Sequence, residues 1–280
     1  MDAKFDRLSE VLRRYPSLLV AFSAGVDSTF LLKAAHRVLG DRAVALTATS
    51  PSMPSGELAA AKAFVAGLGC RHIVLESHEL DNPSYSKNPV NRCFFCKDEL
   101  YRICRAEADR LGIAEIADGT NLDDLKDYRP GLKAADAWRV RHPLVEAEMT
   151  KEDIRRYSRA LDLPTWDKPS SPCLSSRFPY GTAIDRERLK KVADCELFLK
   201  ELRFREFRVR FHGDLARIEV APSEMERLFE SQTRNAIVEK FKAVGFKYVS
   251  VDLQGFRSGS LNEGLEKKSR SVSDPSLADQ

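Results

Sequence analysis

Short runs of apolar residues alternate along the chain with longer stretches in which the apolar positions recur at helical spacing. The runs rich in Val, Leu and Ile predict strands at 18–22, 43–49, 72–77 and 115–117. The helical spacing predicts an amphipathic N-terminal helix and further helices at about 29–39, 57–68 and 93–110. This order predicts an α/β fold, in which helices cover both faces of a parallel sheet and ligands bind beyond the carboxyl ends of the strands.

The pattern changes after Thr150, which is predicted to cap a helix with Asp153 three residues further on. An irregular segment with four prolines follows at 164–182. The remaining pattern predicts a smaller α+β unit, with a helix at 186–202, a hairpin at 207–220, helices at 222–229 and 235–244 and a strand at 247–253. We therefore predict a first domain over 1–165, a second over 166–257 and a disordered tail over 258–280.

The composition excludes several classes of protein. With 43% hydrophobic and 31% charged residues and a formal charge of +3, the chain matches a soluble globular protein rather than a membrane protein or a general nucleic-acid binder. The apolar run at 18–22 is too short for a signal sequence, so a cytoplasmic protein is expected. Without secretion, the six cysteines indicate thiols, metal ligands or redox chemistry rather than a disulfide framework.

The first strand continues into a helix through the segment AFSAGVDSTF at 21–30. Unpaired backbone N–H groups and the helix dipole make such a junction an anion site. Ser23 and Ser28 add hydroxyl donors, and Gly25 lets a phosphate approach the backbone closely. The loop lacks both the lysine of a Walker loop and the G-x-G-x-x-G pattern of a dinucleotide site. The residues alone leave two interpretations, a pyrophosphate cradle and an ordinary capped turn.

The stretch S-A-G-V-D-S resembles the S-G-G-x-D-S loop of the PP-loop ATP pyrophosphatases, which adenylylate a substrate and release pyrophosphate. Ala24 stands where that family usually has glycine, and a positive φ there would strain an alanine by about 1 kcal/mol. The resemblance implies a Rossmann-like PP-loop domain that binds ATP and Mg²⁺. The residues it implies at the phosphates and Mg²⁺ are Ser23, Ala24, Gly25, Asp27 and Ser28, with Ala48 and Ser50 near the adenine.

Four further motifs narrow this resemblance: NRCFFCKDELY, DGTNLDDLKDYRPGLKA, SSPCLSSRFPYGT and DLQGFRSGS. Together they resemble the LarE family, the ATP-dependent sulfur transferases that build the nickel-pincer cofactor of lactate racemase. The likeness extends from about residue 5 to residue 262. It implies a pyridinium biscarboxylate mononucleotide as substrate, a sulfide donor and a homo-oligomer, a hexamer in this family. The composition adds that neither a membrane nor a nucleic acid is expected as a partner.

Cys93 and Cys96 have ligand spacing at the start of a predicted helix, where thiolates are stabilised. Cys173 in the proline-rich segment is a candidate third partner. Three cysteines could hold a [4Fe–4S] cluster with one iron open to sulfide, or Zn²⁺ with a fourth ligand. The resemblance favours the cluster, and a sacrificial Cys173 that gives up its own sulfur is the alternative. The other cysteines are expected to be small apolar side chains: Cys70, Cys104 and Cys195.

The stretch DGTNLDD follows the fourth strand, which places Gly119 at the same edge of the sheet as the pyrophosphate loop. The carboxylates nearby suit Mg²⁺ or substrate, and a solvated loop is the alternative. Arg129 could hold a phosphate or carboxylate beside them. The residues of this stretch with candidate roles are Asp118, Gly119, Thr120, Asn121, Asp123, Asp124, Asp127 and Arg129.

The hairpin at 207–220 alternates apolar and charged positions. Arg208, Arg210 and His212 point away from the core on one strand, and Arg217 and Glu219 face outward with them on the other. So many arginines indicate a phosphate site, with a plain exposed strand as the alternative. By the resemblance, the residues that line the reaction pocket are Glu196, Arg208 and Glu219, with Arg177 as a further candidate.

The combined prediction is an enzyme that adenylylates a carboxylate of the mononucleotide, releases pyrophosphate and lets sulfur displace AMP. A PP-loop enzyme that thiolates a tRNA base is one alternative, although the near-neutral charge counts against it. An ammonia ligase of the GMP or NAD synthetase type is another, but no glutaminase unit is visible. A nucleotide-binding regulator without turnover is the non-enzymatic alternative.

Overall fold

The computed structural model describes residues 3–126, 130–257 and 260–262 of the 280-residue chain. Its contacts divide the chain into two compact units. The first contains the residues up to 175 together with 180–193, and the second contains 176–179 and the residues from 194 onward. Of the predicted disordered tail at 258–280, only the turn at 260–262 lies among the described residues.

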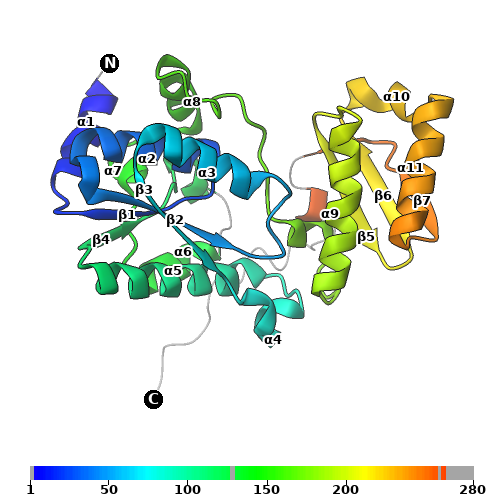
Figure 1. Cartoon of the computed structure of the whole chain (residues 1–280), viewed down its shortest axis with the longest axis horizontal. Helices are drawn as coiled ribbons and strands as arrows, with labels where there is room; N and C mark the ends of the chain where they lie inside the picture. Colours follow the sequence, from blue (N-terminus) through cyan, green and yellow to red (C-terminus); the bar gives the residue numbers. More distant parts are fainter. Residues whose placement is uncertain (1–2, 127–129, 258–259, 263–280) are drawn as a thin grey trace, which may run out of the picture. The chain divides into compact units, whose positions relative to one another are not determined.

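A four-stranded parallel sheet forms the centre of the first unit, in the order β3-β2-β1-β4 (Figure 1). Its strands are β1 (Leu18–Ala21), β2 (Ala43–Thr49), β3 (Arg71–Glu76) and β4 (Glu115–Ala117). The predicted α/β fold is confirmed. Because β1 pairs with β2 on one side and β4 on the other, its carboxyl end lies at the point where the strand order reverses, which is where such sheets bind ligands.

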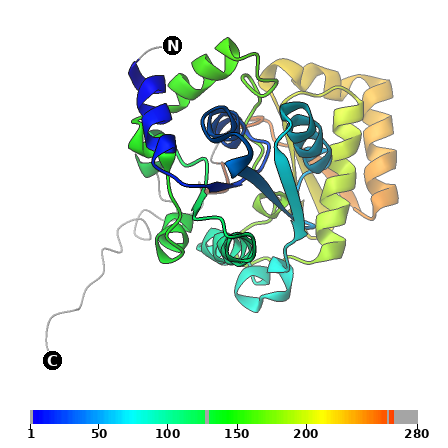
Figure 2. The same cartoon turned by 60° about the vertical axis from the view of Figure 1, so that its left-hand side comes forward.

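Two apolar layers cover this sheet because alternate residues of a strand face opposite sides. Leu18 and Val20 belong to one layer, and Leu19 between them belongs to the other. Figure 2 shows the helices of the two layers on opposite sides of the strands. The first layer includes α1 (Ala3–Arg13), α2 (Val26–Leu39), α3 (Glu57–Leu68) and α8 (Lys151–Ala160), and the second includes α5 (Arg92–Leu111) and α6 (Gly131–Ala137).

The local signals read from the sequence recur in the structure. Thr150 caps α8, and its capping box with Asp153 is complete: the hydroxyl accepts from the Asp153 N–H at 3.2 Å, and the Asp153 carboxylate accepts from the Thr150 N–H at 3.1 Å. Two short helices also belong to this unit, α4 (Pro83–Ser86) and α7 (Pro143–Glu146).

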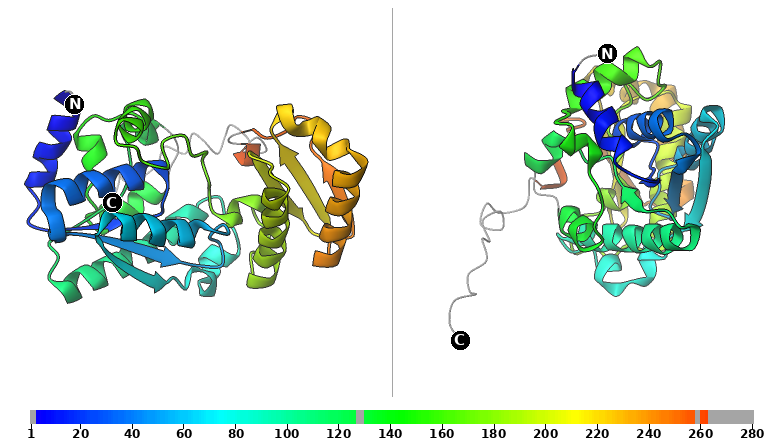
Figure 3. Two further views of the ribbon diagram at one scale, coloured as in Figure 1. Left: turned by 45° about the horizontal axis from the view of Figure 1, so that its top comes forward. Right: turned by 90° about the vertical axis from the view of Figure 1, so that its left-hand side faces the viewer.

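The second unit contains a three-stranded sheet in the order β5-β6-β7. The predicted hairpin consists of antiparallel β5 (Phe207–His212) and β6 (Leu215–Val220), and β7 (Tyr248–Val251) pairs parallel to β6. Figure 3 shows the helices beside this sheet. These are α9 (Arg186–Glu201), whose first residues belong to the first unit, α10 (Met225–Phe229) and α11 (Ser231–Val244). In the part of the chain that the structure describes, no helix is long and apolar enough to cross a membrane.

Candidate active site

The loop between β1 and α2 has the backbone shape expected of an anion-binding turn. Ala24 adopts the left-handed conformation with φ 55°, so an alanine occupies a position that favours glycine, at a strain of about 1 kcal/mol. Gly25 is the N-cap of α2 with φ −80° and has no side chain with which to cap the first turn. The N–H groups of that turn are therefore not capped by their own N-cap side chain.

Two serine hydroxyls meet inside this loop. The Oγ atoms of Ser23 and Ser28 lie 3.1 Å apart, and Ser28 Oγ also accepts the Ser23 N–H at 3.3 Å. Ser28 can donate to the Gly25 carbonyl at 3.4 Å. These contacts hold together residues that the sequence predicts at the phosphates. Their role in binding ATP stays a prediction.

The end of β4 contacts the same loop. A Cβ atom added to Gly119 would lie only 2.8 Å from the backbone nitrogen of Ser28 and 3.0 Å from Asp27 Cβ. Asn121 donates to Asp27 Oδ1 at 3.3 Å. The structure thus brings Gly119 and Asn121 from the motif after β4 to the pyrophosphate loop, as the common edge of the sheet predicts.

The other acidic residues of that motif have partners within the protein. Asp123 accepts the Lys151 N–H and the Lys126 ammonium, both at 2.8 Å, and these hydrogen bonds, led by that of Lys126, lower the pKa of its carboxyl. Asp118 is buried and accepts from Tyr101 and His142. The predicted candidates Asp127 and Arg129 lie outside the described residues.

Two lysines reach the loop from distant segments of the first unit. Lys151, at the start of α8, forms an ion pair with Asp27. Lys168 donates to the Ala24 carbonyl at 3.0 Å and to Glu57 Oε2 at 2.6 Å. Sequence reasoning missed both, because it looked for a lysine within the loop as in a Walker motif. Each lysine is paired with a carboxylate, Lys151 with Asp27 and Lys168 with Glu57.

A buried carboxylate lies at the end of β2. Glu79, in the short 3-10 helix Glu79–Asp81, accepts from Ser50 at 2.8 Å, Ser52 at 2.6 Å and Tyr85 at 3.2 Å. Tyr85 also contacts the Ser175 hydroxyl at 2.6 Å. We call these five residues the Glu79 network. Sequence analysis missed Glu79 and placed Ser50 near the adenine, a role that stays a prediction, as does that of Ala48 in the same strand.

The three candidate cysteines share neighbours at the start of α5. Burial lowers the pKa of the Arg92 guanidinium, but the nearby Cys173 and Cys93 help to raise it above its usual value. Burial, the Glu79 carboxylate and Cys173 together raise the pKa of the Cys96 thiol well above its usual value. The structure therefore gathers Cys93, Cys96 and Cys173 into one region of the first unit.

This donor set fits an iron–sulfur or zinc site in its chemistry, since soft thiolates are the ligands of both. Among residues 3–126, 130–257 and 260–262, however, no three His, Cys, Asp or Glu side chains are already arranged to hold a metal ion. The three sulfurs would have to come closer together to hold one. The remaining thiols are separate: Cys104 and Cys195 are buried, and Cys70 is half-buried and donates to the Ala43 carbonyl.

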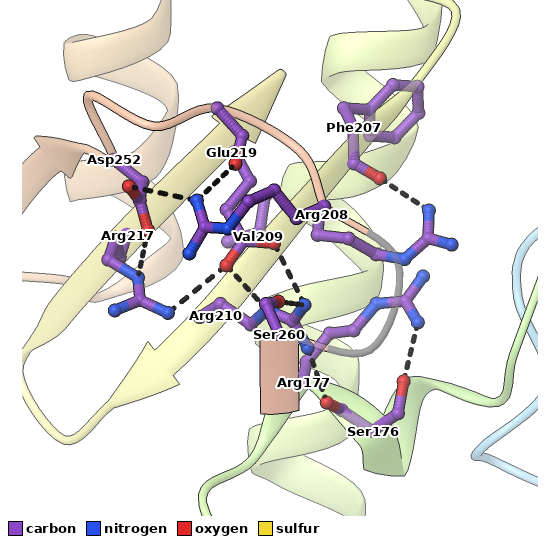
Figure 4. A network of polar contacts seen from close by, with 12 residues as sticks. Ser176, Arg177, Phe207, Arg208, Val209, Arg210, Arg217, Glu219, Asp252 and Ser260 are labelled. Carbon is purple, nitrogen blue, oxygen red and sulfur yellow. Dashed lines mark hydrogen bonds and ion pairs between the residues drawn. The ribbon is translucent and has the colours of Figure 1, made fainter. Parts of the chain in front are cut away.

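The second unit contains a group of arginines and carboxylates (Figure 4). Arg177 makes a bidentate ion pair with Glu196, with N–O distances of 2.8 and 3.0 Å. Glu196 also accepts the Val209 N–H at 2.9 Å. Arg210 pairs with Glu219 in the same way at 2.9 and 2.8 Å. The four residues that the resemblance places in the reaction pocket thus occur in this network or beside it: Arg177, Glu196, Arg208 and Glu219.

One sequence expectation about this hairpin is wrong. Glu219 and Arg210 were expected to face outward, yet Glu219 is 0% exposed and Arg210 only 7%. The reason is that the face opposite the apolar core is covered as well: Arg210 donates to the Ser176 carbonyl at 2.7 Å and to Ser260 Oγ at 2.9 Å. The alternation of apolar and charged residues along a strand does not show whether the charged face is itself buried by other polar groups.

Arg208 is a third arginine beside these two ion pairs, and it is half-buried. Burial and the nearby Arg177 guanidinium lower the pKa of Arg208 to about 10. Its guanidinium lies 4.7 Å from the centroid of the Phe256 ring and donates to the Phe207 carbonyl at 2.7 Å. Burial and the neighbouring guanidinium both disfavour the charged form of Arg208, so a bound anion would stabilise that form.

No protein-family model matches the chain. An uncharacterized protein of Synechocystis sp. is 43% identical to it over 267 residues, which cover 95% of this chain and 100% of that protein. The pyridinium-3,5-bisthiocarboxylic acid mononucleotide synthase of Lactiplantibacillus plantarum is 35% identical over 261 residues, 93% of this chain and 94% of the synthase. An uncharacterized protein of Methanocaldococcus jannaschii is 33% identical over 172 residues, 61% of this chain and 66% of that protein.

Proposed function

Because the chain belongs to the LarE family, that of the pyridinium-3,5-bisthiocarboxylic acid mononucleotide synthase, and is a sulfurtransferase enzyme, we propose that it converts carboxylates of a pyridinium mononucleotide to thiocarboxylates during nickel-pincer cofactor synthesis. The observation that carries the proposal is the left-handed turn at Ala24, which precedes the uncapped start of α2. That geometry suits the phosphates of ATP.

Activation is the first step. A substrate carboxylate oxygen attacks the α-phosphorus of ATP, the bond from that phosphorus to the bridging oxygen breaks, and pyrophosphate leaves. In the acyl adenylate that forms, AMP is the leaving group. AMP leaves far more easily than the oxide that would have to leave from an unactivated carboxylate. The loop of Ser23, Gly25 and Ser28 would bind the pyrophosphate portion, and Asp27 with its neighbours would bind the Mg²⁺ that accompanies ATP.

Sulfur transfer is the second step, and two sources remain. A [4Fe–4S] cluster on Cys93, Cys96 and Cys173 would supply an iron on which sulfide from a donor could be held. A hydrosulfide ion that attacks the acyl carbon displaces AMP, gives the thiocarboxylate and releases one proton.

In the alternative route the Cys173 thiolate attacks the acyl carbon, and AMP leaves as a thioester forms. Loss of the Cys173 α-proton to a base and cleavage of its Cβ–S bond then release the thiocarboxylate and leave dehydroalanine. This route consumes one cysteine for each sulfur. The protein therefore loses the mass of one H₂S in this route, whereas its mass is unchanged in the first route.

Arg208 is proposed to bind the phosphate of the mononucleotide in the second unit. It is half-buried beside the guanidinium of Arg177, and burial and this like charge both disfavour its charged form, which a bound phosphate would stabilise. In this view Glu196 and Glu219 hold arginines in place and act through them. The homo-oligomer, a hexamer by resemblance, can be tested by sedimentation.

Anaerobic purification followed by iron and sulfide analysis, with Cys96→Ala as the comparison, separates the two sulfur sources. Stoichiometric iron that the variant loses supports the cluster. Iron absent from both proteins, with H₂S lost from Cys173 after turnover, supports the sacrificial route. Absence of pyrophosphate release from ATP and the pyridinium substrate would overturn the proposed function as a whole.

A further inference from the structure

Lys168 makes contacts that its position in the sequence does not suggest. It lies in the proline-rich segment after α8, and its ammonium donates to the Ala24 carbonyl at 3.0 Å and to Glu57 Oε2 at 2.6 Å. Both side chains of the ion pair are largely buried, with 23% of Lys168 and 17% of Glu57 exposed. A pair shielded in this way is less weakened by solvent than a surface pair.

The backbone around Lys168 is held in place from α8. Arg155 donates one guanidinium nitrogen to the Trp166 carbonyl at 2.7 Å and another to the Lys168 carbonyl at 2.9 Å. The Lys168 N–H bonds to the Thr165 carbonyl at 3.1 Å. The Lys168 side chain therefore extends from a fixed turn, and its contact with the nucleotide loop joins two ordered segments.

The same segment is held again just beyond Cys173. The Leu174 N–H donates to the Ser52 carbonyl at 2.7 Å, and Arg92 donates to the Ser175 carbonyl at 2.9 Å. Only five residues, PSSPC, separate Lys168 from Leu174, and two of them are prolines. Six residue steps span at most about 21 Å, and proline narrows the accessible conformations further.

From these contacts we propose that Lys168 is a positioning residue that couples the nucleotide loop to the segment carrying Cys173. The proposal rests on the proposed function, since it assigns ATP to the loop and sulfur transfer to that segment. The Ala24 peptide lies where the phosphates would bind, so phosphates that order this peptide also fix the Lys168 contact. The ordered contact restricts the five-residue segment, and the sulfur is placed when the adenylate forms.

This coupling has a chemical purpose. An acyl adenylate that waits for sulfur is open to hydrolysis, which returns the carboxylate and AMP and wastes one ATP. If filling the nucleotide loop orders the sulfur-carrying segment further, attack by sulfur competes better with attack by water. Loss of the contact should therefore reduce product formation more than adenylylation.

Lys168→Met is the test, with Lys168→Arg as the conservative variant. Lys191→Met, which removes an i,i+4 surface ion pair with Glu187, is the matched control. We expect Lys168→Met to retain pyrophosphate release within about threefold, while the thiocarboxylate formed per pyrophosphate falls about tenfold and AMP still accumulates. The arginine variant should recover part of this ratio. A parallel loss of pyrophosphate and product, or no change in the ratio, would overturn the proposal.

A second readout needs no substrate turnover. Hydrogen exchange of the peptide over 167–175 is measured in the full protein with and without a non-hydrolysable ATP analogue. We expect the analogue to slow exchange about threefold in the wild type and in Lys191→Met, and to have almost no effect in Lys168→Met. If the wild type binds the analogue but hydrogen exchange over 167–175 is not slowed, the coupling is refuted, even if pyrophosphate release supports the proposed function. Slowing without pyrophosphate release upholds the coupling and rejects the proposed reaction.

Discussion

Gly119→Ala tests whether the end of β4 supports the nucleotide loop. The added Cβ atom would lie 2.8 Å from Ser28 N, 3.0 Å from Asp27 Cβ and 3.1 Å from Asp27 C, and two of these three are backbone atoms. A side chain could rotate away, but backbone atoms at the start of α2 cannot. Since ordinary contacts of carbon lie at about 3.5 Å or more, the two segments would have to separate by about 0.7 Å.

That separation sets the expected magnitude. Overpacking of this kind costs about 1–3 kcal/mol of unfolding free energy. Displacement of a substrate-binding group by 1 Å can cost about a hundredfold in rate, so a shift of about 0.7 Å predicts a loss of tenfold or more in kcat/KM for ATP. Urea unfolding measures the first quantity, and pyrophosphate release at varied ATP concentration measures the second.

Gly67→Ala is the matched control. A Cβ atom at Gly67 meets nothing within 4 Å, and the residue lies in α3, where alanine is the better helix former. This variant should gain up to about 1 kcal/mol and keep full activity. If Gly119→Ala unfolds and turns over like Gly67→Ala, the close packing of Gly119 on Ser28 does not support the loop.

Three further changes test other parts of the structure. Ala24→Gly relieves the left-handed strain and should raise the unfolding free energy by about 0.5–1 kcal/mol, seen as a higher urea midpoint. Glu219→Gln removes the carboxylate charge that pairs with the buried Arg210 and the partly exposed Arg217, and it should cost about 3–5 kcal/mol, against about 0–0.5 kcal/mol for the exposed Glu187→Gln. Burial and Asp194 raise the pKa of Cys195 to about 12 in the folded protein, whereas the thiol of the unfolded chain ionises at about pH 8.5. The contribution of Cys195 to the unfolding free energy is therefore complete below about pH 8.5 and falls by up to about 1.4 kcal/mol per pH unit above it. In Cys195→Ala, the unfolding free energy measured with urea should fall by up to about 1.4 kcal/mol less between about pH 9 and 10 than in the wild type. The same fall in both proteins would contradict the assignment.

The fold of both units could be predicted because its signals are local. The strand at 43–49 and the helix at 57–68 begin and end where the apolar periodicity does. The Thr150 cap depends on two residues three positions apart. Each of these features is decided by residues within one turn or one strand, so a single sequence contains the necessary information.

The site was only partly predictable because much of it depends on long-range contacts. The loop from Ser23 to Ser28 is contiguous, and its pattern identified it. Lys151 and Lys168 contact the loop from more than a hundred residues away, and no spacing rule connects them to it. Glu79 likewise looked like one carboxylate among many, and only its burial with Ser50 and Ser52 distinguishes it.

The two arginine–glutamate pairs of the second unit are difficult to explain by stability alone. Arg177, Glu196, Arg210 and Glu219 are all buried, and the desolvation of such pairs offsets most of their mutual attraction. Apolar side chains of similar volume would stabilise a small domain as well or better. Apolar side chains could not, however, keep the guanidinium of Arg208 close to that of Arg177 in a half-buried environment. Because burial and the Arg177 guanidinium lower the pKa of Arg208, a bound phosphate would stabilise its charged form, and we expect this arrangement to favour phosphate binding more than stability.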